Sequence, residues 1–282
     1  MLVFLNGQII KEEDAKISIS DLSYQFVYGL FETIRCESGI PLFFEEHYKR
    51  LNHSANEIKM PFPVDMEEIK GWIKDVISAN KLTNARVKII ISKRAEEKFN
   101  VFILAVPLEN LPSSYSLIAK KLDRDPKSVS FRNKTTSRAD SYVAYTEAIQ
   151  NGYNDALYLN SKNELVECTR ANIFLVMQDK IITPFLESGI LSGVTRAKIL
   201  HIAKKEGIQI EEKNVHSLYL NRAQSVFITN AIIGIMPVSR IKLEDRECNF
   251  STGAVITKLR NLYYIEVQEY LTKSNNKSFS YN

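Results

Sequence analysis

The stretch "NGYNDALYLNSKNELVECTRANIFLV", residues 151–176, decides the fold of the second half of the chain. Its apolar residues come in short blocks, which is typical of β-strands. Polar breaks at 161–163 and 169–171 separate the blocks, and a further break at 178–179 precedes "KIITPF". The pattern predicts consecutive strands that form an antiparallel meander.

A lysine in a polar segment comes shortly before this stretch. Lys134 lies in "FRNKTTSRAD", between Arg132 and Arg138, and a predicted helix follows that ends near Gly152. A lysine is a nucleophile only when it is neutral, so its usual pKa of about 10.4 must fall through burial or nearby positive charge. A neutral lysine can form a Schiff base with a carbonyl substrate or an aldehyde cofactor. The alternative is a solvated loop lysine.

The first third of the chain predicts an α+β domain. "MLVFLNGQII" predicts a hairpin around Asn6-Gly7, and "FETIRCESGIPLFF" predicts a second pair of strands. "EEHYKRLNHSANEIK" and "MEEIKGWIKDVISAN" have helical spacing of apolar residues, and "ARVKIIIS" and "NVFILAVP" are typical of buried strands. The predicted domains are residues 1–106 and 121–282, with a linker at 107–120 that begins with the proline-rich "PLENLPSS".

The last third alternates helix and strand patterns. "GVTRAKILHIAKKEG" predicts a helix that ends at Gly207, and "QSVFITNAIIGIMPV" predicts a strand and a turn of small residues. The polar tail "TKSNNKSFSYN" is expected to be frayed.

Composition excludes several classes of protein. The chain has 282 residues, 45% hydrophobic and 25% charged, with a formal net charge of +4 and interspersed charges, which does not favour nucleic-acid binding. Cys36, Cys168 and Cys248 are far apart and show no metal or disulfide spacing, so we expect no metal site and a reducing, cytoplasmic environment. No signal peptide is predicted, and no apolar run approaches the roughly 20 residues of a membrane span.

Two segments could bind a phosphate group. Arg50 lies on the predicted helix "EEHYKRL", where an arginine can bind a phosphate bidentately, or form a surface ion pair with Glu46 one turn earlier. "GVT", residues 193–195, precedes the helix "RAKILHIAKK". Free N–H groups at that helix end could bind an anion, or Thr195 could be an ordinary N-cap.

Two other segments have equally open interpretations. Glu167 lies on the strand "ELVECT", where it either faces solvent or, if buried, needs a positive partner. In "TNAIIGIMPV", Asn230, Ala231 and Gly234 could form a turn whose backbone approaches a ligand, or an ordinary tight loop.

The order of these segments resembles the class IV, or fold-type IV, pyridoxal-phosphate enzymes, which include branched-chain and D-amino-acid aminotransferases and 4-amino-4-deoxychorismate lyase. The resemblance rests on "YGLFETIR", "FFEEHYKRL", the isolated lysine before a helix, residues 151–176, "ITPFLESGILSGVTR" and "FITNAIIGIMPV". It implies a two-domain α+β fold, pyridoxal 5'-phosphate in the interdomain cleft, a small amino substrate and a homodimer.

The resemblance also implies a role for each candidate residue. Lys134 would hold the cofactor covalently and move the substrate proton, and Glu167 would face the pyridine nitrogen. Arg50 would bind the cofactor phosphate, and Leu191 would pack on the ring. Apart from the resemblance, we expect Arg132 or Arg138 either to add to the positive field around Lys134 or to meet a substrate carboxylate. The remaining positions would complete the phosphate site: Val194, Thr195, Asn230 and Ala231.

Several positions favour one member of the family. D-amino-acid aminotransferases have a tyrosine where this chain has Phe31 and an Arg-x-His pair where it has "ISKRAEEKF". Asn230-Ala231 followed by Met-Pro-Val is similar to the aminodeoxychorismate lyases, although Ser137 replaces an asparagine common in the family. The expected activity is therefore the lyase reaction, which yields pyruvate and 4-aminobenzoate. The alternatives are an aminotransferase of branched-chain or other amino acids and a non-catalytic cofactor-binding protein.

Overall fold

The computed structural model describes residues 1–282 except 95–97, 123–124, 179 and 280–282, and the side chains of 277–279 are also outside the description. Part of the "ISKRAEEKF" segment therefore lies outside the described residues. The chain divides into two compact units. Unit 1 comprises Met1–Asn110, Asn133–Ser137 and Glu266–Asn282, and unit 2 comprises Leu111–Arg132 and Arg138–Ile265.

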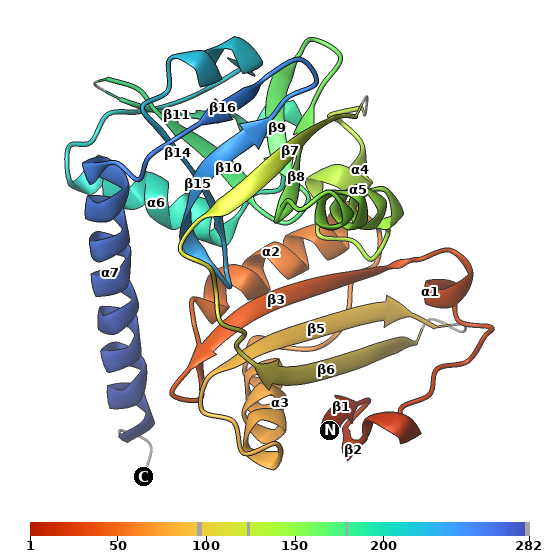
Figure 1. The fold of residues 1–282 in the computed structure, drawn as a ribbon. Helices are drawn as coiled ribbons and strands as arrows, with labels where there is room; N and C mark the ends of the chain where they lie inside the picture. Colours follow the sequence, from red (N-terminus) through yellow and green to blue (C-terminus); the bar gives the residue numbers. More distant parts are fainter. Residues whose placement is uncertain (95–97, 123–124, 179, 280–282) are drawn as a thin grey trace. The chain divides into compact units, whose positions relative to one another are not determined.

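Unit 1 contains a β-sheet with two helices on one face (Figure 1). Its sheet has six strands in the order β2-β1-β6-β5-β3-β4. The elements in chain order are β1 Leu2–Leu5, β2 Gln8–Lys11, the 3-10 helix η1 Glu12–Asp14, α1 Leu22–Gln25, β3 Gly29–Glu37, β4 Ile40–Pro41, α2 Phe44–Glu57, α3 Met66–Ala79, β5 Ala85–Lys93 and β6 Phe99–Pro107.

The predicted first hairpin is confirmed. β1 and β2 pair antiparallel, with Leu5 opposite Gln8, so only Asn6 and Gly7 form the turn. Both have positive φ, 51° and 94°, as a two-residue hairpin turn requires. The predicted β3–β4 turn, the two helices and the paired strands β5 and β6 are also confirmed.

The two faces of the unit 1 sheet differ in burial. On β3, residues 30, 32, 34 and 36 are buried while residues 31, 33, 35 and 37 are only half-buried, because successive side chains of a strand point to opposite faces. The buried face packs with α2 and α3 around a core that includes Ile34, Leu51 and Ile73. The other face, here called the open face, carries Phe31.

Unit 2 is built on a larger sheet. Its elements in chain order are β7 Tyr115–Lys121, α4 Val129–Arg132, α5 Ala139–Gln150, β8 Asp155–Leu159, β9 Glu164–Cys168, β10 Asn172–Val176, β11 Ile181–Pro184, η2 Leu186–Ser188, α6 Val194–Lys205, β12 Ile210–Lys213, β13 Val215–His216, η3 Ser217–Asn221, β14 Ser225–Asn230, β15 Gly234–Lys242 and β16 Glu247–Asn249. The helix α7, Ala254–Phe279, begins in unit 2, and its residues from Glu266 onward belong to unit 1.

The predicted antiparallel meander is only half right. β8 pairs with β9 and β10 pairs with β11, but β9 and β10 are not neighbours in the sheet. The strand order β12-β11-β10-β14-β15-β7-β8-β9-β13 places β14, β15, β7 and β8 between them, and β10 pairs with β14, which comes much later in the chain. Local sequence predicts hairpins, because their partners are adjacent in the chain, but it carries no signal for a distant strand that competes for the same edge.

The predicted frayed tail is also wrong as far as Phe279. α7 continues through this segment, and residues 280–282 lie outside the described part of the chain. Thr272 donates a hydrogen bond to the Gln268 carbonyl at 2.9 Å, and Lys273 pairs with Glu269 at 3.7 Å one turn earlier. Polar composition alone suggested fraying, whereas these contacts along the helix support a longer α7.

The segment between the two sheets is short. β6 ends at Pro107 and β7 begins at Tyr115, so β7 takes up much of the stretch 107–120.

Among the described residues, no helix has the length and apolar character that a membrane crossing requires. The same residues contain no cluster of His, Cys, Asp or Glu that could hold a metal ion.

Candidate functional site

β3 positions Lys134. The Lys134 carbonyl accepts a hydrogen bond from Phe31 N at 2.9 Å, Thr136 N donates to the Gly29 carbonyl at 2.9 Å, and Leu30 and Thr135 form an isolated bridge. Residues 133–137 thus continue the unit 1 sheet for a few residues, although they follow β7 and α4 in the chain. α5 begins only at Ala139, so the helix predicted to follow the lysine does not hold it.

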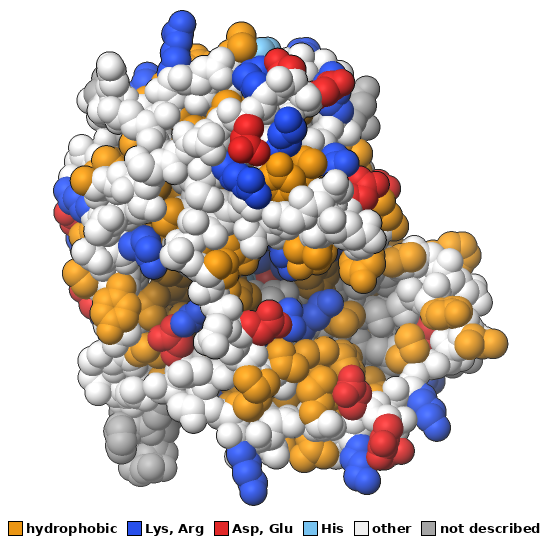
Figure 2. All heavy atoms as spheres, in the orientation of Figure 1, with side chains coloured by type: hydrophobic (Ala, Val, Ile, Leu, Met, Phe, Trp, Pro, Cys, Tyr) orange, Lys and Arg blue, Asp and Glu red, His pale blue; other side chains and the backbone are white. Residues whose placement is uncertain are grey.

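The Lys134 amine lies over an aromatic ring. Its Nζ is 4.5 Å from the centroid of Phe31, and Lys88 Nζ is 4.9 Å from the same centroid. Lys88 pairs across β5 and β3 with Thr33, on the open face of the sheet. Figure 2 shows hydrophobic side chains over β3, β5 and β6, with Lys, Arg and acidic side chains among them. Around Phe31, the open face therefore offers an aromatic ring beside two amines, while Arg35 and Glu37 lie further along the same face of β3.

Arg50 faces a buried carboxylate. Its Nε and Nη2 donate to Glu32 Oε1 and Oε2 at 2.8 and 2.6 Å, in a bidentate pair. His47 Nδ1 is 2.8 Å from Glu32 Oε2. The Glu32 side chain is 1% exposed and the Arg50 side chain 12%. We call Glu32, His47 and Arg50 the charged triad.

The pKa values in the charged triad follow from burial and pairing. Burial alone would raise the pKa of Glu32, but the charges of Arg50 and His47 and their hydrogen bonds hold it well below its usual value. Burial lowers the pKa of His47, and this outweighs the attraction of Glu32. Because the Glu32 carboxylate can only accept a hydrogen bond, His47 Nδ1 is the donor in this contact. The charge of Lys134 also lowers the pKa of His47, which places Lys134 in the neighbourhood of the triad.

The triad corrects one interpretation of Arg50. The interpretation of Arg50 as a surface residue paired with Glu46 is wrong. Its side chain is largely buried, and its bidentate partner is Glu32. Sequence reasoning missed Glu32 and His47. A signal was present: Glu32 occupies an inward position of the alternating strand "FETIR", where a carboxylate requires a cationic partner.

In unit 2, Glu167 holds the loop that precedes α6. Its Oε2 accepts a hydrogen bond from Leu191 N at 3.0 Å, and the Asn172 side chain donates to the Leu191 carbonyl at 3.0 Å. Gly193 lies so close to Asn172 that a Cβ there would stand 2.1 Å from the Asn172 Oδ1. Glu167 is half-buried on β9 and is oriented by a backbone N–H. This contact gives the half-buried carboxylate a polar partner in the backbone.

The N-terminus of α6 is not capped as one interpretation predicted. Gly193 is the N-cap residue and makes no side-chain cap hydrogen bond, and the helix begins at Val194. The N-cap interpretation of Thr195 is therefore wrong, because Thr195 lies inside the first turn, 2% exposed. A helix start with a glycine cap presents backbone N–H groups that suit an anion.

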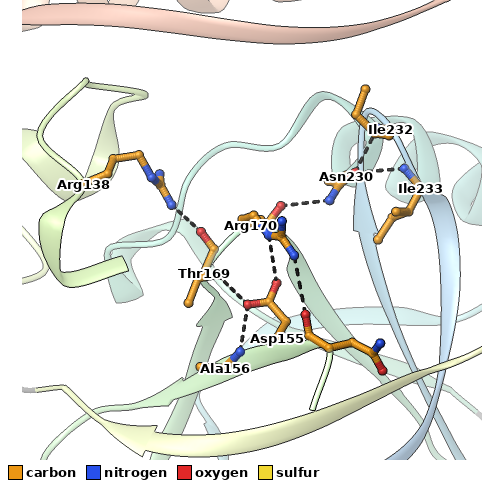
Figure 3. A network of polar contacts seen from close by, with 9 residues as sticks. Arg138, Asp155, Ala156, Thr169, Arg170, Asn230, Ile232 and Ile233 are labelled. Atoms are coloured by element: carbon orange, nitrogen blue, oxygen red, sulfur yellow. Dashed lines mark hydrogen bonds and ion pairs between the residues drawn. The ribbon is translucent and has the colours of Figure 1, made fainter. Parts of the chain in front are cut away.

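Asp155 organises the turn between β9 and β10 (Figure 3). It is 1% exposed and accepts hydrogen bonds from the Thr169 hydroxyl and from Ala156 N. Arg170 Nε lies 3.7 Å from its second oxygen, and Arg138 donates to the Thr169 carbonyl. Arg138 thus supports the turn that leads away from Glu167.

Asn230 closes the turn after β14. Its Oδ1 accepts hydrogen bonds from Ile232 N and Ile233 N, both at 2.9 Å, and its Nδ2 donates to the Arg170 carbonyl at 3.0 Å (Figure 3). Gly234 has φ +59°, which allows the chain to enter β15. Asn230 thereby connects the turn that contains Ala231 to the turn that follows β9.

Each unit therefore gathers some of the predicted residues. In unit 1, Phe31, Lys134 and Arg50 lie on or beside β3. Those of unit 2 lie at strand ends and at the start of α6: Arg138, Glu167, Leu191, Val194, Thr195, Asn230 and Ala231.

The chain is similar to known enzymes along nearly its whole length. The family described as amino-transferase class IV matches residues 29–241. A Methanocaldococcus jannaschii protein, provisionally named a branched-chain-amino-acid aminotransferase, is 29% identical over 92% of this chain and 93% of its own length. The aminodeoxychorismate lyase of Bacillus subtilis is 25% identical over 99% of both chains.

A solved structure supports the fold. The branched-chain amino acid aminotransferase of the organism abbreviated T.th., solved with pyridoxamine 5'-phosphate, superposes with a TM-score of 0.85 and is 25% identical. The match covers 95% of this chain and 94% of that one. The two sheets described above are consistent with the two-domain, fold-type IV architecture. The chain belongs to the class IV amino-transferase family and is an enzyme that depends on pyridoxal 5'-phosphate.

Proposed function

We propose that this enzyme is a 4-amino-4-deoxychorismate lyase, which releases pyruvate and 4-aminobenzoate from its substrate. The observation that carries the proposal is the open face around Phe31, where a ring without a hydroxyl lies below the amines of Lys134 and Lys88. A substrate with an apolar ring and more than one carboxylate suits such a face. The ring would pack beside Phe31, and the Lys88 ammonium would attract a carboxylate.

Each unit offers groups that could hold the phosphate of the cofactor. Arg50 is fixed by its bidentate pair with Glu32, so its orientation is set before a ligand arrives. The first turn of α6 offers the N–H groups of Val194 and Thr195, and its N-cap residue, Gly193, has no side chain that could cap them. We propose that these groups bind the phosphate, together with the turn at Asn230 and Ala231.

Glu167 would face the pyridine nitrogen. Its Oε2 is held by Leu191 N at 3.0 Å, which orients the carboxylate. A carboxylate at that position keeps the nitrogen protonated. Leu191 itself would pack on one face of the ring.

Lys134 would both anchor the cofactor and move a proton. Pyridoxal 5'-phosphate, when bound, supplies an aldehyde that condenses with amines and a ring that accepts electrons from the substrate Cα. Lys134 Nζ, when it is not joined to the cofactor, would take the proton from the substrate Cα. In the lyase reaction the enolpyruvyl group then leaves as pyruvate and the substrate ring becomes aromatic.

Transamination is the second candidate. Lys134 would then both take and give back the proton, and the product would be a keto acid. The 29% identity to a protein provisionally named a branched-chain-amino-acid aminotransferase favours this candidate. An aromatic side chain at position 31 is also compatible with branched-chain substrates. Lys134 and Glu167 serve both reactions, so the substrate must be determined by assay.

The deciding experiment compares two incubations of the purified enzyme. One contains 4-amino-4-deoxychorismate alone, and the other contains branched-chain amino acids with 2-oxoglutarate. We expect 4-aminobenzoate to form without any keto-acid acceptor. Glutamate formation in the second incubation, with no 4-aminobenzoate in the first, would select the aminotransferase.

Replacement of Lys134 tests the covalent anchor. The Lys134→Ala variant, loaded with equal cofactor, should lose the protein-bound visible absorption that borohydride bleaches in the parent enzyme. We expect turnover to fall at least about 10²-fold, because the proton acceptor is lost. Lys88→Ala is the matched control, since it removes the other amine over Phe31 and should keep the absorption.

We also propose that the enzyme is a cytoplasmic homodimer. The segment before β3 exposes large apolar side chains, with Ile19 76%, Tyr24 66% and Phe26 70% exposed, and a second copy could cover them. The cysteines are free, as is usual in a reducing compartment. Light scattering that gives the mass of one chain would contradict the dimer.

A further inference from the structure

The helix α2 begins without a capping side chain of its own. Its N-cap residue, Phe43, makes no side-chain cap hydrogen bond and has left-handed backbone angles of φ 52° and ψ 40°. Serine, threonine, aspartate and asparagine are the usual residues at this position, because their side chains accept hydrogen bonds from the first N–H groups of the helix. The first turn of α2 therefore needs a hydrogen-bond acceptor from elsewhere.

Tyr270 of α7 supplies that acceptor. Its hydroxyl accepts a hydrogen bond from Phe44 N, the first N–H of α2, at 3.2 Å and lies 3.4 Å from the Pro41 carbonyl, to which it donates. Its ring lies 5.0 Å from the ring of Phe43. Burial raises the pKa of Tyr270, so the phenol keeps its proton for the Pro41 carbonyl. A side chain 226 residues away in sequence thus caps α2.

The first turn of α2 leads directly to the charged triad. His47 N donates to the Phe43 carbonyl at 3.2 Å, so His47 closes the turn that Tyr270 caps. The His47 side chain holds Glu32 Oε2, the same oxygen that accepts from Arg50 Nη2. Fraying of this turn would move His47 and change the position of Glu32, and with it the direction of the Arg50 guanidinium.

We infer that Tyr270 is a positioning residue for the cofactor phosphate. It fixes the start of α2, and through His47 and Glu32 it sets the orientation of Arg50. The inference rests on the proposed role of Arg50 in phosphate binding. It gives the C-terminal half of α7, residues 266–279, a function in cofactor affinity.

The test uses Tyr270→Phe, which keeps the ring beside Phe43 and removes only the hydroxyl. Tyr264→Phe is the matched control, because Tyr264 lies on the same helix and is 62% exposed. The affinities of the cofactor-free enzymes for pyridoxal 5'-phosphate and for pyridoxal, which lacks the phosphate, are measured by titration. We expect Tyr270→Phe to bind pyridoxal 5'-phosphate about three- to tenfold more weakly, with pyridoxal unchanged. An equal loss for both ligands, or no loss, would overturn the inference.

Hydrogen exchange of the cofactor-free enzymes tests the cap separately. In Tyr270→Phe the amide of Phe44 and its neighbours in the first turn of α2 should exchange about three- to tenfold faster than in the parent and in Tyr264→Phe. Unchanged protection would overturn the capping role. Arg50→Gln distinguishes the two proposals: if it leaves the preference for pyridoxal 5'-phosphate over pyridoxal intact, the proposed phosphate role of Arg50 fails, whatever the exchange data show for Tyr270.

Discussion

The two units each bury a carboxyl group beside their candidate residues, and its pKa shifts in opposite directions in the two units. Glu32 in unit 1 and Asp155 in unit 2 are both 1% exposed. Glu32 has Arg50 and His47 at 2.6 and 2.8 Å, and its pKa falls well below the usual value. Asp155 has one half-exposed arginine, Arg170, at 3.7 Å, and burial raises its pKa. Equal burial therefore does not set the direction, whereas the number and distance of the cations do.

This difference extends to how each set of residues is held in place. In unit 1, charges paired at short range orient Arg50. In unit 2, neutral hydrogen bonds and close packing hold the loop before α6, through the contacts of Leu191 and Gly193 with Glu167 and Asn172. Substitutions should therefore cost most stability where they leave a buried charge unpaired, and least where a neutral group can replace the original.

The largest effect is expected from Glu32→Gln. The change leaves Arg50 buried without a carboxylate, so the free energy of unfolding should fall by about 3 kcal/mol in urea titrations. Glu37→Gln is the matched control on the same strand, because Glu37 pairs with Arg35 near the surface at 2.6 Å. We expect a loss below about 1 kcal/mol for the control. Equal losses in the two variants would contradict the comparison.

Glu32→Gln should also change how the free energy of unfolding depends on pH. Because the pKa of Glu32 is lowered in the folded protein, its stabilising contribution is present above the unfolded pKa of about 4.3 and is lost as the pH falls further. Unfolding free energies of the parent should therefore decrease as the pH falls below about 5. Glu32→Gln should show a shallower decrease over that range, and parallel curves would exclude Glu32 as a source of the slope.

An intermediate effect is expected from Gly193→Ala. The new Cβ would lie 2.1 Å from Asn172 Oδ1, so Asn172 or the loop must move. We expect a loss of about 2 kcal/mol in unfolding free energy, within the range for overpacking. Gly71→Ala on α3 is the control, because a Cβ there meets no atom within 4 Å and alanine favours a helix. A stable Gly193→Ala variant would mean that the loop tolerates displacement.

The smallest effect is expected from Asp155→Asn. The amide oxygen can still accept from the Thr169 hydroxyl and from Ala156 N, so the unfolding free energy at neutral pH should change by less than about 1 kcal/mol. The pKa of Asp155 is raised on folding, so ionisation costs the parent stability as the pH rises above the unfolded value of about 3.9. Asp155→Asn should escape this cost. A loss as large as that of Glu32→Gln would show that Arg170 matters more than its distance indicates.

Local patterns predicted elements well where the relevant contacts are local. The first hairpin depends on Asn6 and Gly7, which adopt the positive φ that the turn needs, and the end of α5 depends on Gly152 with φ +77°. The candidate residues Arg50, Lys134 and Glu167 could be named from motif order alone. The structure places them on α2, beside β3 and on β9.

The prediction failed where a distant segment made the decisive contact. The meander failed because β14 pairs with β10 at the edge where β9 was expected. The tail is a separate case, because its polar residues make i,i+4 contacts within α7 itself. Glu32 was passed over because its two partners, His47 and Arg50, lie on α2, 15 and 18 residues further along the chain.

The sequence by itself determined the family, the cofactor and the set of candidate residues, because these depend on residue types in a fixed order along the chain. Only the tertiary structure decided that residues 133–137 continue the sheet of unit 1, that Glu32 neutralises Arg50, and that Tyr270 caps α2. The physical reason is that hydrogen bonds and charges act over a few ångströms of space, and the partners in these contacts are separated by up to 226 residues of chain.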